Sequence, residues 1–440
     1  MKTDLSRRDF IKTTASVGAA AGLAGMLPRA AHAASGGYQG TMNVYGIIVP
    51  TPAQPGATQL FKQFQQAHSG ISIQNHGFTS ERFVALFSAA QAAGEQIDLL
   101  YLNGQDLRRY ALAGDLLPLN NLPHLNRFMP LGLKTYTVNN TLWALPSGST
   151  GGFPIFYNKA LLDKYHLAPP QTYADLLSVG KALTKQGVSA YTHDGKDIYL
   201  WPVWFFTTYA QVTGNKSIEK TQATLKGHGK FTDPEVVEAL DLIFNLARNK
   251  IFSPDVLSLD TPGAQAEFLT GRAAFWLHYD GIIATVRQAA PPALNPPGMN
   301  LDVTLFPWVG KKTVQRQFPG GTGAAFGIYS KIGADRKAAA LQILDYCTTD
   351  QADTYLVKNS LSTLGTNIHA QGSPDPVALK EKAILPNMSI YLDWYWPPEI
   401  TQAFQQGIQA GINLSKTAKQ VSADIQTVFE GLLKSGYKFH

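Results

Sequence analysis

Residues 71–114 decide the fold class, and they read ISIQNHGFTSERFVALFSAAQAAGEQIDLLYLNGQDLRRYALAG. Ile71 to His76 and Ile97 to Leu102 are short apolar runs that predict two strands. Between them, Glu81 to Ala93 repeat apolar residues at the spacing of one helical face, which predicts an amphipathic helix that ends at a glycine. A second helix is predicted from Leu107 to Ala113. The segment therefore alternates strand and helix.

The same alternation begins earlier, with a predicted strand from Met42 to Val49 and a helix from Thr58 to His68. This β-α-β-α-β-α order predicts a parallel, doubly wound α/β sheet. Ligands of such sheets bind beyond the carboxyl ends of the strands. The candidate contacts at these ends are Gly46, Glu81, Gln105 and Asp106.

The 440 residues exceed one typical core, so two domains are expected. Later signals include a capping box at Thr172 and Asp175, a strand from Ala324 to Ser330, and largely helical residues from Glu399 to Ser435. Before that strand, we expect a glycine-rich loop whose backbone N–H groups approach a solute. Its residues are Gly320, Gly321, Thr322 and Gly323.

The N-terminus resembles a twin-arginine export signal. Ser6 to Lys12 read SRRDFIK, an Ala- and Gly-rich apolar run follows, and Ala31-His32-Ala33 fit a cleavage site. Residues 1–33 are therefore expected to direct export through the Tat translocase and then to be cleaved off, leaving a soluble periplasmic protein.

Charge and cysteine usage exclude several function classes. The first 33 residues hold five basic and two acidic groups, so their removal lowers the formal net charge from +6 to +3. That charge makes no basic stripe, and a nucleic-acid partner is not expected. Cys347 is the single cysteine, at helical spacing from Leu341 and Leu344, and is expected to be a buried core thiol.

Four motifs follow one another along roughly residues 40–370. They are QIDLLYL at 96–102 with LAGDLLPL at 112–119, WALP at 143–146 with FYNKALL at 156–162, FLTGRAAF at 268–275 with Asp280-Gly281, and PGG at 319–321 with FGI at 326–328. In this order and spacing they resemble family 1 extracellular solute-binding proteins, the maltose-binding-protein-like group. Gln96 stands where that family usually has proline, and the tryptophan that often follows its glycine is missing after Gly281.

The resemblance implies a two-lobed periplasmic binding protein fold of type II, with a ligand cleft between lobes that close by hinge motion. The first lobe would comprise residues 38–150 and 310–365, and the second 151–309 and 366–440. The protein would be the monomeric solute-binding subunit of an ABC importer, delivering its solute to a membrane permease without a cofactor or catalysis. No closed set of metal ligands is visible in the sequence, and a metal at His193-Asp194 or at His278 and Asp280 stays an open alternative.

A sugar site needs aromatic rings for the sugar faces and a few polar groups for its hydroxyls. The candidate aromatic contacts are Trp204, Tyr279, Trp394 and Trp396, whereas Phe205 and Phe206 are expected in the core. The resemblance places Tyr279 and Asp280 in a cleft-facing loop. Ser147, directly after the WALP motif, is a further candidate contact.

Alternatives remain open at this point. The solute could be a polyol, a glycerol phosphate or a polyamine in place of a sugar. A polyamine would need several carboxylates, and a phosphate ester would need an arginine such as Arg82 or Arg316. The chain could also be an exported carbohydrate-active enzyme, with two carboxylates drawn from Asp98, Asp106, Asp280 and Asp393, although no hydrolase motif joins them.

Overall fold

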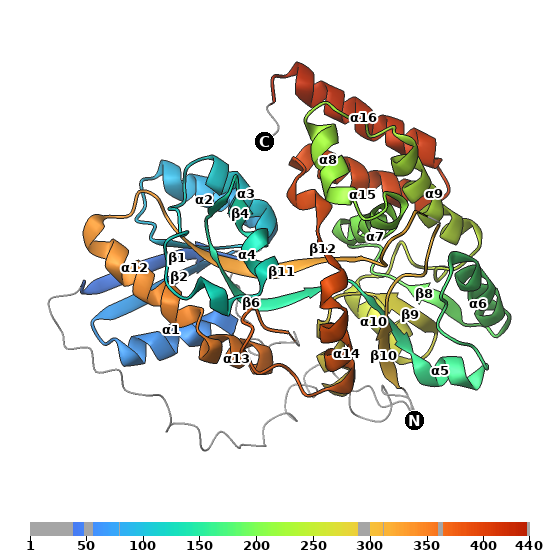
Figure 1. Ribbon diagram of the computed structural model, residues 1–440, viewed down its shortest axis with the longest axis horizontal. Coiled ribbons are helices and arrows are strands. Elements are labelled where there is room, and N and C mark those ends of the chain that lie inside the picture. The colour runs from blue at the N-terminus through green and yellow to red at the C-terminus, as the bar shows by residue number, and fades with distance from the viewer. Residues whose placement is uncertain are drawn as a thin grey trace, which may run out of the picture. The chain divides into compact units, whose positions relative to one another are not determined.

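The computed structural model of the protein describes residues 38–47, 56–78, 80–288, 300–310, 312–359 and 364–437 (Figure 1). The expected export signal, residues 1–33, lies outside the described residues. Within the described ranges, no helix is long and apolar enough to cross a membrane.

The first sheet has the strand order β12-β11-β3-β1-β2, and β6 also pairs with β11. β1 runs parallel to both β2 and β3, as the strand–helix alternation predicts. β11 is antiparallel to β3, so the sheet is mixed rather than wholly parallel. The strands are β1 (Gly40–Gly46), β2 (Ile71–Gly77), β3 (Leu99–Leu102), β6 (Leu145–Gly152), β11 (Phe318–Ile328) and β12 (Met388–Ile390).

Helices from both ends of the sequence pack on this sheet. α1 contacts α12, and α12 contacts β1 and β11 (Figure 1). The apolar faces of the early helices enter one core with residues from the later return segment, such as Phe326 and Ile343. The helices and the small hairpin of this region are α1 (Gly56–Ala67), α2 (Ser80–Ala92), α3 (Gly104–Leu112), η2 (Leu125–Arg127), α4 (Pro130–Thr135), β4 (Thr137–Val138), β5 (Thr141–Leu142), α12 (Ala334–Cys347) and α13 (Asp350–Asn359).

The second sheet has the strand order β10-β7-β9-β8. β7 (Ile155–Asn158) is antiparallel to β10 (Leu301–Thr304) and to β9 (Ala273–Leu277), whereas β8 (Ser189–Thr192) is parallel to β9. This sheet is therefore also mixed.

A second, strongly aromatic core lies against this sheet and includes Trp201, Phe205 and Phe206, which confirms the core prediction for the two phenylalanines. The helices of this region are α5 (Lys159–Lys164), α6 (Tyr173–Lys185), η3 (Ile198–Leu200), α7 (Pro202–Val212), α8 (Ser217–Leu225), α9 (Pro234–Arg248), α10 (Thr261–Leu269), α11 (Gly281–Gln288), α14 (Pro376–Ile384), η4 (Leu385–Asn387), η5 (Leu392–Trp394), α15 (Pro398–Ile412) and α16 (Ala418–Lys434).

β6 and β11 run side by side as a long antiparallel pair between the two cores (Figure 1). Gly320 lies opposite Gly152, and Gly321 lies opposite Gly151. The prediction of a glycine-rich loop is therefore wrong, because these glycines form the first half of β11. Glycine inside a strand marks a close approach. Here a Cβ on Gly152 would lie 2.3 Å from the carbonyl oxygen of Pro319.

Several local predictions are confirmed. The Asp175 N–H donates to the Thr172 hydroxyl at 3.1 Å, and the Thr172 N–H donates to the Asp175 carboxylate at 2.9 Å, which completes the capping box of α6. The C-terminal residues form α15 and α16, and Cys347 is a buried free thiol.

Candidate functional site

The carboxyl end of β3 leads directly into α3. Asn103 caps this helix, and its side-chain oxygen accepts a hydrogen bond from the N–H of Asp106 at 2.8 Å. Asp106 is buried, and burial raises the pKa of its carboxyl. Gln105, on the same turn, is half-buried. The first turn of α3 therefore places polar groups at the edge that the topology predicts.

Gly46, the candidate at the end of β1, lies where two strands approach closely. A Cβ at Gly46 would lie 2.4 Å from the carbonyl oxygen of Tyr101, so this residue is glycine because β1 and β3 approach closely there. The side chain of Glu81, the candidate at the end of β2, lies outside the described part of the structure.

Trp394 is the predicted site residue that brings the separate segments together. Its indole, at the end of η5, is half-buried and lies against α3 and β11. A Cβ on Gly104 would come within 2.4 Å of the ring, and a Cβ on Gly321 would come within 2.5 Å. Trp394 and Gly321, both predicted as contacts, are therefore neighbours.

A series of aromatic rings continues from Trp394 toward the second sheet. Tyr391 lies 5.0 Å from Trp394 between ring centroids, and Phe153 lies 6.1 Å from Tyr391. Phe153 in turn contacts Tyr279 at 6.4 Å. Tyr279 is 40% exposed, so the series ends at a ring that solvent reaches. We call Trp394, Tyr391, Phe153 and Tyr279 the aromatic path.

A buried histidine–aspartate contact anchors the loop that carries Tyr279. His278 Nε2 lies 3.3 Å from Asp194 Oδ2, and the Trp276 indole N–H donates to Asp194 Oδ1 at 2.8 Å. Burial alone would raise the pKa of Asp194, but the hydrogen bond and charge of His278 lower it to about 2. Among the described residues, no group of three or more His, Cys, Asp or Glu side chains is arranged to hold a metal.

Two carboxylates lie along the aromatic path. Asp280 is buried, and a Cβ on Gly151 would lie 3.0 Å from its carboxyl carbon. Its charge and that of Asp393 add to the effect of burial in holding the pKa of Tyr391 well above its usual value. The structure thus brings Asp280 and Tyr279 to the same place as Trp394, by way of Tyr391 and Phe153.

Asp393 was not among the predicted contacts. Burial raises the pKa of its carboxyl to about 7, and its Oδ1 atom is buried with no hydrogen-bond partner in the described part of the chain. From the sequence it was only one of four carboxylates available to a hydrolase, and the residue before Trp394. Its position between Tyr391 and Trp394 is the signal that points to a contact role.

Four other predicted contacts are buried in this structure, as Asp106 and Asp280 are. Trp204 is fully buried and packs edge-on against Tyr191. Trp396 stacks on Phe404 at 4.2 Å inside the second core. The Ser147 hydroxyl donates to the carbonyl oxygen of Cys347 at 3.3 Å. Gly320 is covered, since a Cβ there would lie 2.1 Å from the sulfur of Met388.

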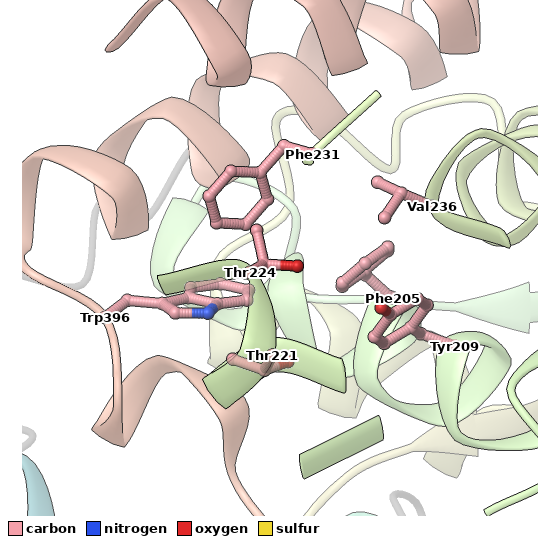
Figure 2. Close-up of a pocket in the computed structure, with 7 residues that line it drawn as sticks. All are labelled: Phe205, Tyr209, Thr221, Thr224, Phe231, Val236 and Trp396. Carbon is pink, nitrogen blue, oxygen red and sulfur yellow. The ribbon is translucent and has the colours of Figure 1, made fainter. Parts of the chain in front are cut away.

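Figure 2 shows a small cavity inside the second core, and it is not large enough for a sugar. Its volume is about 10 Å³, close to the minimum for one water molecule. The lining side chains are Phe205, Tyr209, Thr221, Thr224, Phe231, Val236 and Trp396.

The model of the bacterial extracellular solute-binding protein family matches residues 59–387, three quarters of the chain. The chain belongs to that family. A twin-arginine translocation signal matches residues 4–24, so the protein is exported to the periplasm. The proteins of this family bind solutes and are not enzymes.

Known proteins of similar sequence and structure agree with the fold. An uncharacterized ABC transporter extracellular-binding protein, PH1039 of Pyrococcus horikoshii, is 23% identical over 181 residues, which is 40% of this chain and 42% of that protein. A chitin oligosaccharide binding protein superposes with a TM-score of 0.76 at 19% identity, covering 89% of this chain and 98% of its own. Maltose-bound MalE3 of T. maritima superposes with a TM-score of 0.71 at 20% identity, covering 89% and 99%. The chain therefore has the two-lobed fold of the periplasmic solute-binding proteins.

Proposed function

We propose that the protein binds a carbohydrate on the aromatic path and delivers it to the permease of an ABC importer. The observation that carries this proposal is the half-buried indole of Trp394, with Tyr391 at 5.0 Å and the carboxylate of Asp393 beside it. An aromatic ring covers the C–H face of a sugar, and a carboxylate accepts its hydroxyls. The chitin oligosaccharide and maltose named for the two similar structures support the same solute class.

We further propose that the site lies where two lobes face each other. The first lobe comprises residues 38–150 and 310–365, and the second comprises 151–309 and 366–440. The two largest hydrophobic cores among the described residues support this division, because each takes its residues from one proposed lobe. Met388 of β12 pairs with Phe318 in the first sheet, so the short stretch around β12 contacts both lobes. Solute binding without chemical conversion is part of the proposal.

A cationic solute such as a polyamine is the second candidate. Burial raises the pKa of Tyr391, and the nearby carboxyl groups of Asp393, Asp280 and Glu381 raise it further, so three acidic side chains lie near this ring. A phosphate ester has less support. Arg82 is exposed, and Arg316 lies over Trp308 at 5.8 Å, where it also contacts Gln171.

The test is thermal unfolding of the mature protein with maltose, a chitin oligosaccharide and spermidine. A solute that binds the folded state adds about 2.7 kcal/mol of stability at a hundredfold excess over its Kd. We expect one sugar to raise the Tm and to be recovered unchanged. W394A should abolish the shift, whereas W308A, at an exposed tryptophan, should keep it.

A Tm shift with spermidine and with neither sugar would contradict the carbohydrate proposal and indicate a cationic solute. Conversion of the sugar during incubation would contradict the non-catalytic proposal.

A further inference from the structure

The six-membered ring of Trp394 lies against two positions of the main chain that carry no side chain. The place where a Cβ of Gly104 would stand is 2.4 Å from Cε3 and 2.5 Å from Cζ3 of the indole. The corresponding place at Gly321 is 2.5 Å from Cη2 and 2.9 Å from Cζ3. Real Cβ atoms do not approach other atoms this closely, so the ring can occupy this position only while both residues are glycine.

The conformation of the backbone does not explain these two glycines. Neither Gly104 nor Gly321 is among the residues with positive φ. Gly104 is the first residue of α3, where alanine is a better helix former, and Gly321 lies inside β11, where glycine weakens a strand. The space that Trp394 occupies is therefore the physical reason for glycine at both positions.

A second contact on α3 holds the same segment. Gly104 and Arg108 are four residues apart, so they lie on one face of the helix. The guanidinium carbon of Arg108 lies 5.5 Å from the centre of the Tyr395 ring, next to Trp394 in sequence. Burial lowers the pKa of Arg108, as expected for a guanidinium packed into this contact. Consecutive aromatic residues are thus fixed by consecutive turns of α3.

We infer that Gly104 and Gly321 are positioning residues for solute binding, which act by holding the indole of Trp394 in a fixed place beside Tyr391 and Asp393. The two glycines belong to segments that are more than 200 residues apart, and they receive a ring from a third segment. A side chain at either position moves the ring from this place. The inference rests on the proposed function, because it assigns Trp394 to the solute.

The test compares G104A and G321A with G431A. Gly431 lies in α16 with nothing within 4 Å of its Cβ position, so its replacement is a matched glycine-to-alanine control. The first measurement is the near-UV circular dichroism of Trp394, taken as the wild-type spectrum minus that of W394F. We expect G104A and G321A to change this signal and G431A to leave it unchanged.

The second measurement is the Kd for maltose or the chitin oligosaccharide, whichever raises the Tm of the wild type. Forcing a methyl group into a packed site perturbs it enough for roughly a tenfold rise in Kd. We expect this rise in G104A and in G321A, with the melting transition retained. In a W394A background, adding G104A should cause no further rise, because the glycine acts through the ring.

An equal rise in Kd with and without Trp394 would overturn the inference, since the glycines would then act independently of the indole. An unchanged Trp394 spectrum and unchanged Kd in both variants would also overturn it. If the wild type binds neither sugar, the proposed carbohydrate function fails, while the spectrum still decides whether the glycines position the ring.

Discussion

Arg336 Nε donates to Asp98 Oδ1 at 2.7 Å, and this ion pair joins the start of β3 to the first turn of α12. Asp98 is fully buried and also accepts the N–H of Asn43 at 2.7 Å. The aspartate of the QIDLLYL motif is therefore a structural residue that ties the early strands to the return segment.

Loss of the Asp98 carboxylate should destabilise the protein strongly. D98A leaves the Arg336 guanidinium without its buried partner, a change that costs about 3–5 kcal/mol. The free energy of unfolding in urea measures this. D163A is the control, because the Lys159–Asp163 pair is exposed and should change stability by at most about 1 kcal/mol. Equal effects of the two variants would contradict the structural role of Asp98.

His193 should make stability depend on pH. It is fully buried in the second core, and burial lowers the pKa of its imidazole to about 4. The pKa of a histidine in the unfolded chain is about 6.5. Between pH 6.5 and pH 4, the imidazole is therefore protonated in the unfolded state and neutral in the folded state. The contribution of His193 to stability should therefore be complete above pH 6.5 and fall by about 3 kcal/mol as the pH drops toward 4. Asp393 acts in the opposite direction, because a carboxyl with a raised pKa of about 7 stabilises the folded state as the pH falls.

Urea unfolding of the wild type and of H193Q at pH 7.5 and pH 5 isolates this loss, because Asp393 titrates in both proteins and its effect cancels in the difference. H124Q, at an exposed position, should behave as the wild type does. An identical pH dependence in H193Q and the wild type would assign the effect to other groups.

Trp396 should be needed for folding stability, and Trp394 for solute binding. Trp396 is stacked on Phe404 in the core, so W396A should cost about 3–5 kcal/mol of folding stability. Trp394 is half-buried, so W394A should cost less stability but abolish solute binding. Denaturation and binding titrations on both variants check this, and a reversed pattern would contradict the assignment of Trp394 to the solute.

Asp393 should make solute binding sensitive to pH near neutrality. Burial raises the pKa of its carboxyl to about 7, and the ionised form is the better acceptor for solute hydroxyls. Affinity should therefore fall as the pH decreases from 8 to 6. D393N should weaken binding and lose this dependence, whereas D424N, in an exposed pair with Lys416, should retain both. A steep pH profile in D393N would exclude Asp393 as its cause.

Local patterns in the sequence were sufficient for most elements of the first sheet. The apolar repeat after Glu81 and the glycine at Gly94, which has a φ of 68°, correctly marked α2 and its end. The antiparallel position of β11 beside β3 was beyond such reasoning, because it depends on pairing Leu102 with Ala325 across more than 200 residues.

The candidate site was only partly accessible from sequence. Aromatic composition singled out Trp394 and Trp396 equally, because neighbours in a short loop have the same local signals. Their difference arises from tertiary packing. Trp396 stacks on Phe404 of α15, whereas Trp394 packs against Gly104 and Gly321. The glycines of β11 were predicted to form a loop because the strand that pairs with them, β6, is distant in sequence.

The position of β12 has a consequence for biosynthesis. The first sheet takes strands from Gly40 to Ile390, so its edge cannot be completed until nearly the whole chain has left the ribosome. A nascent chain that has reached only residue 300 has made β1, β2 and β3 but lacks β11, the strand that β3 must pair with. The first sheet is therefore completed only at the end of synthesis or after it, long after the twin-arginine signal at residues 4–24 has been made.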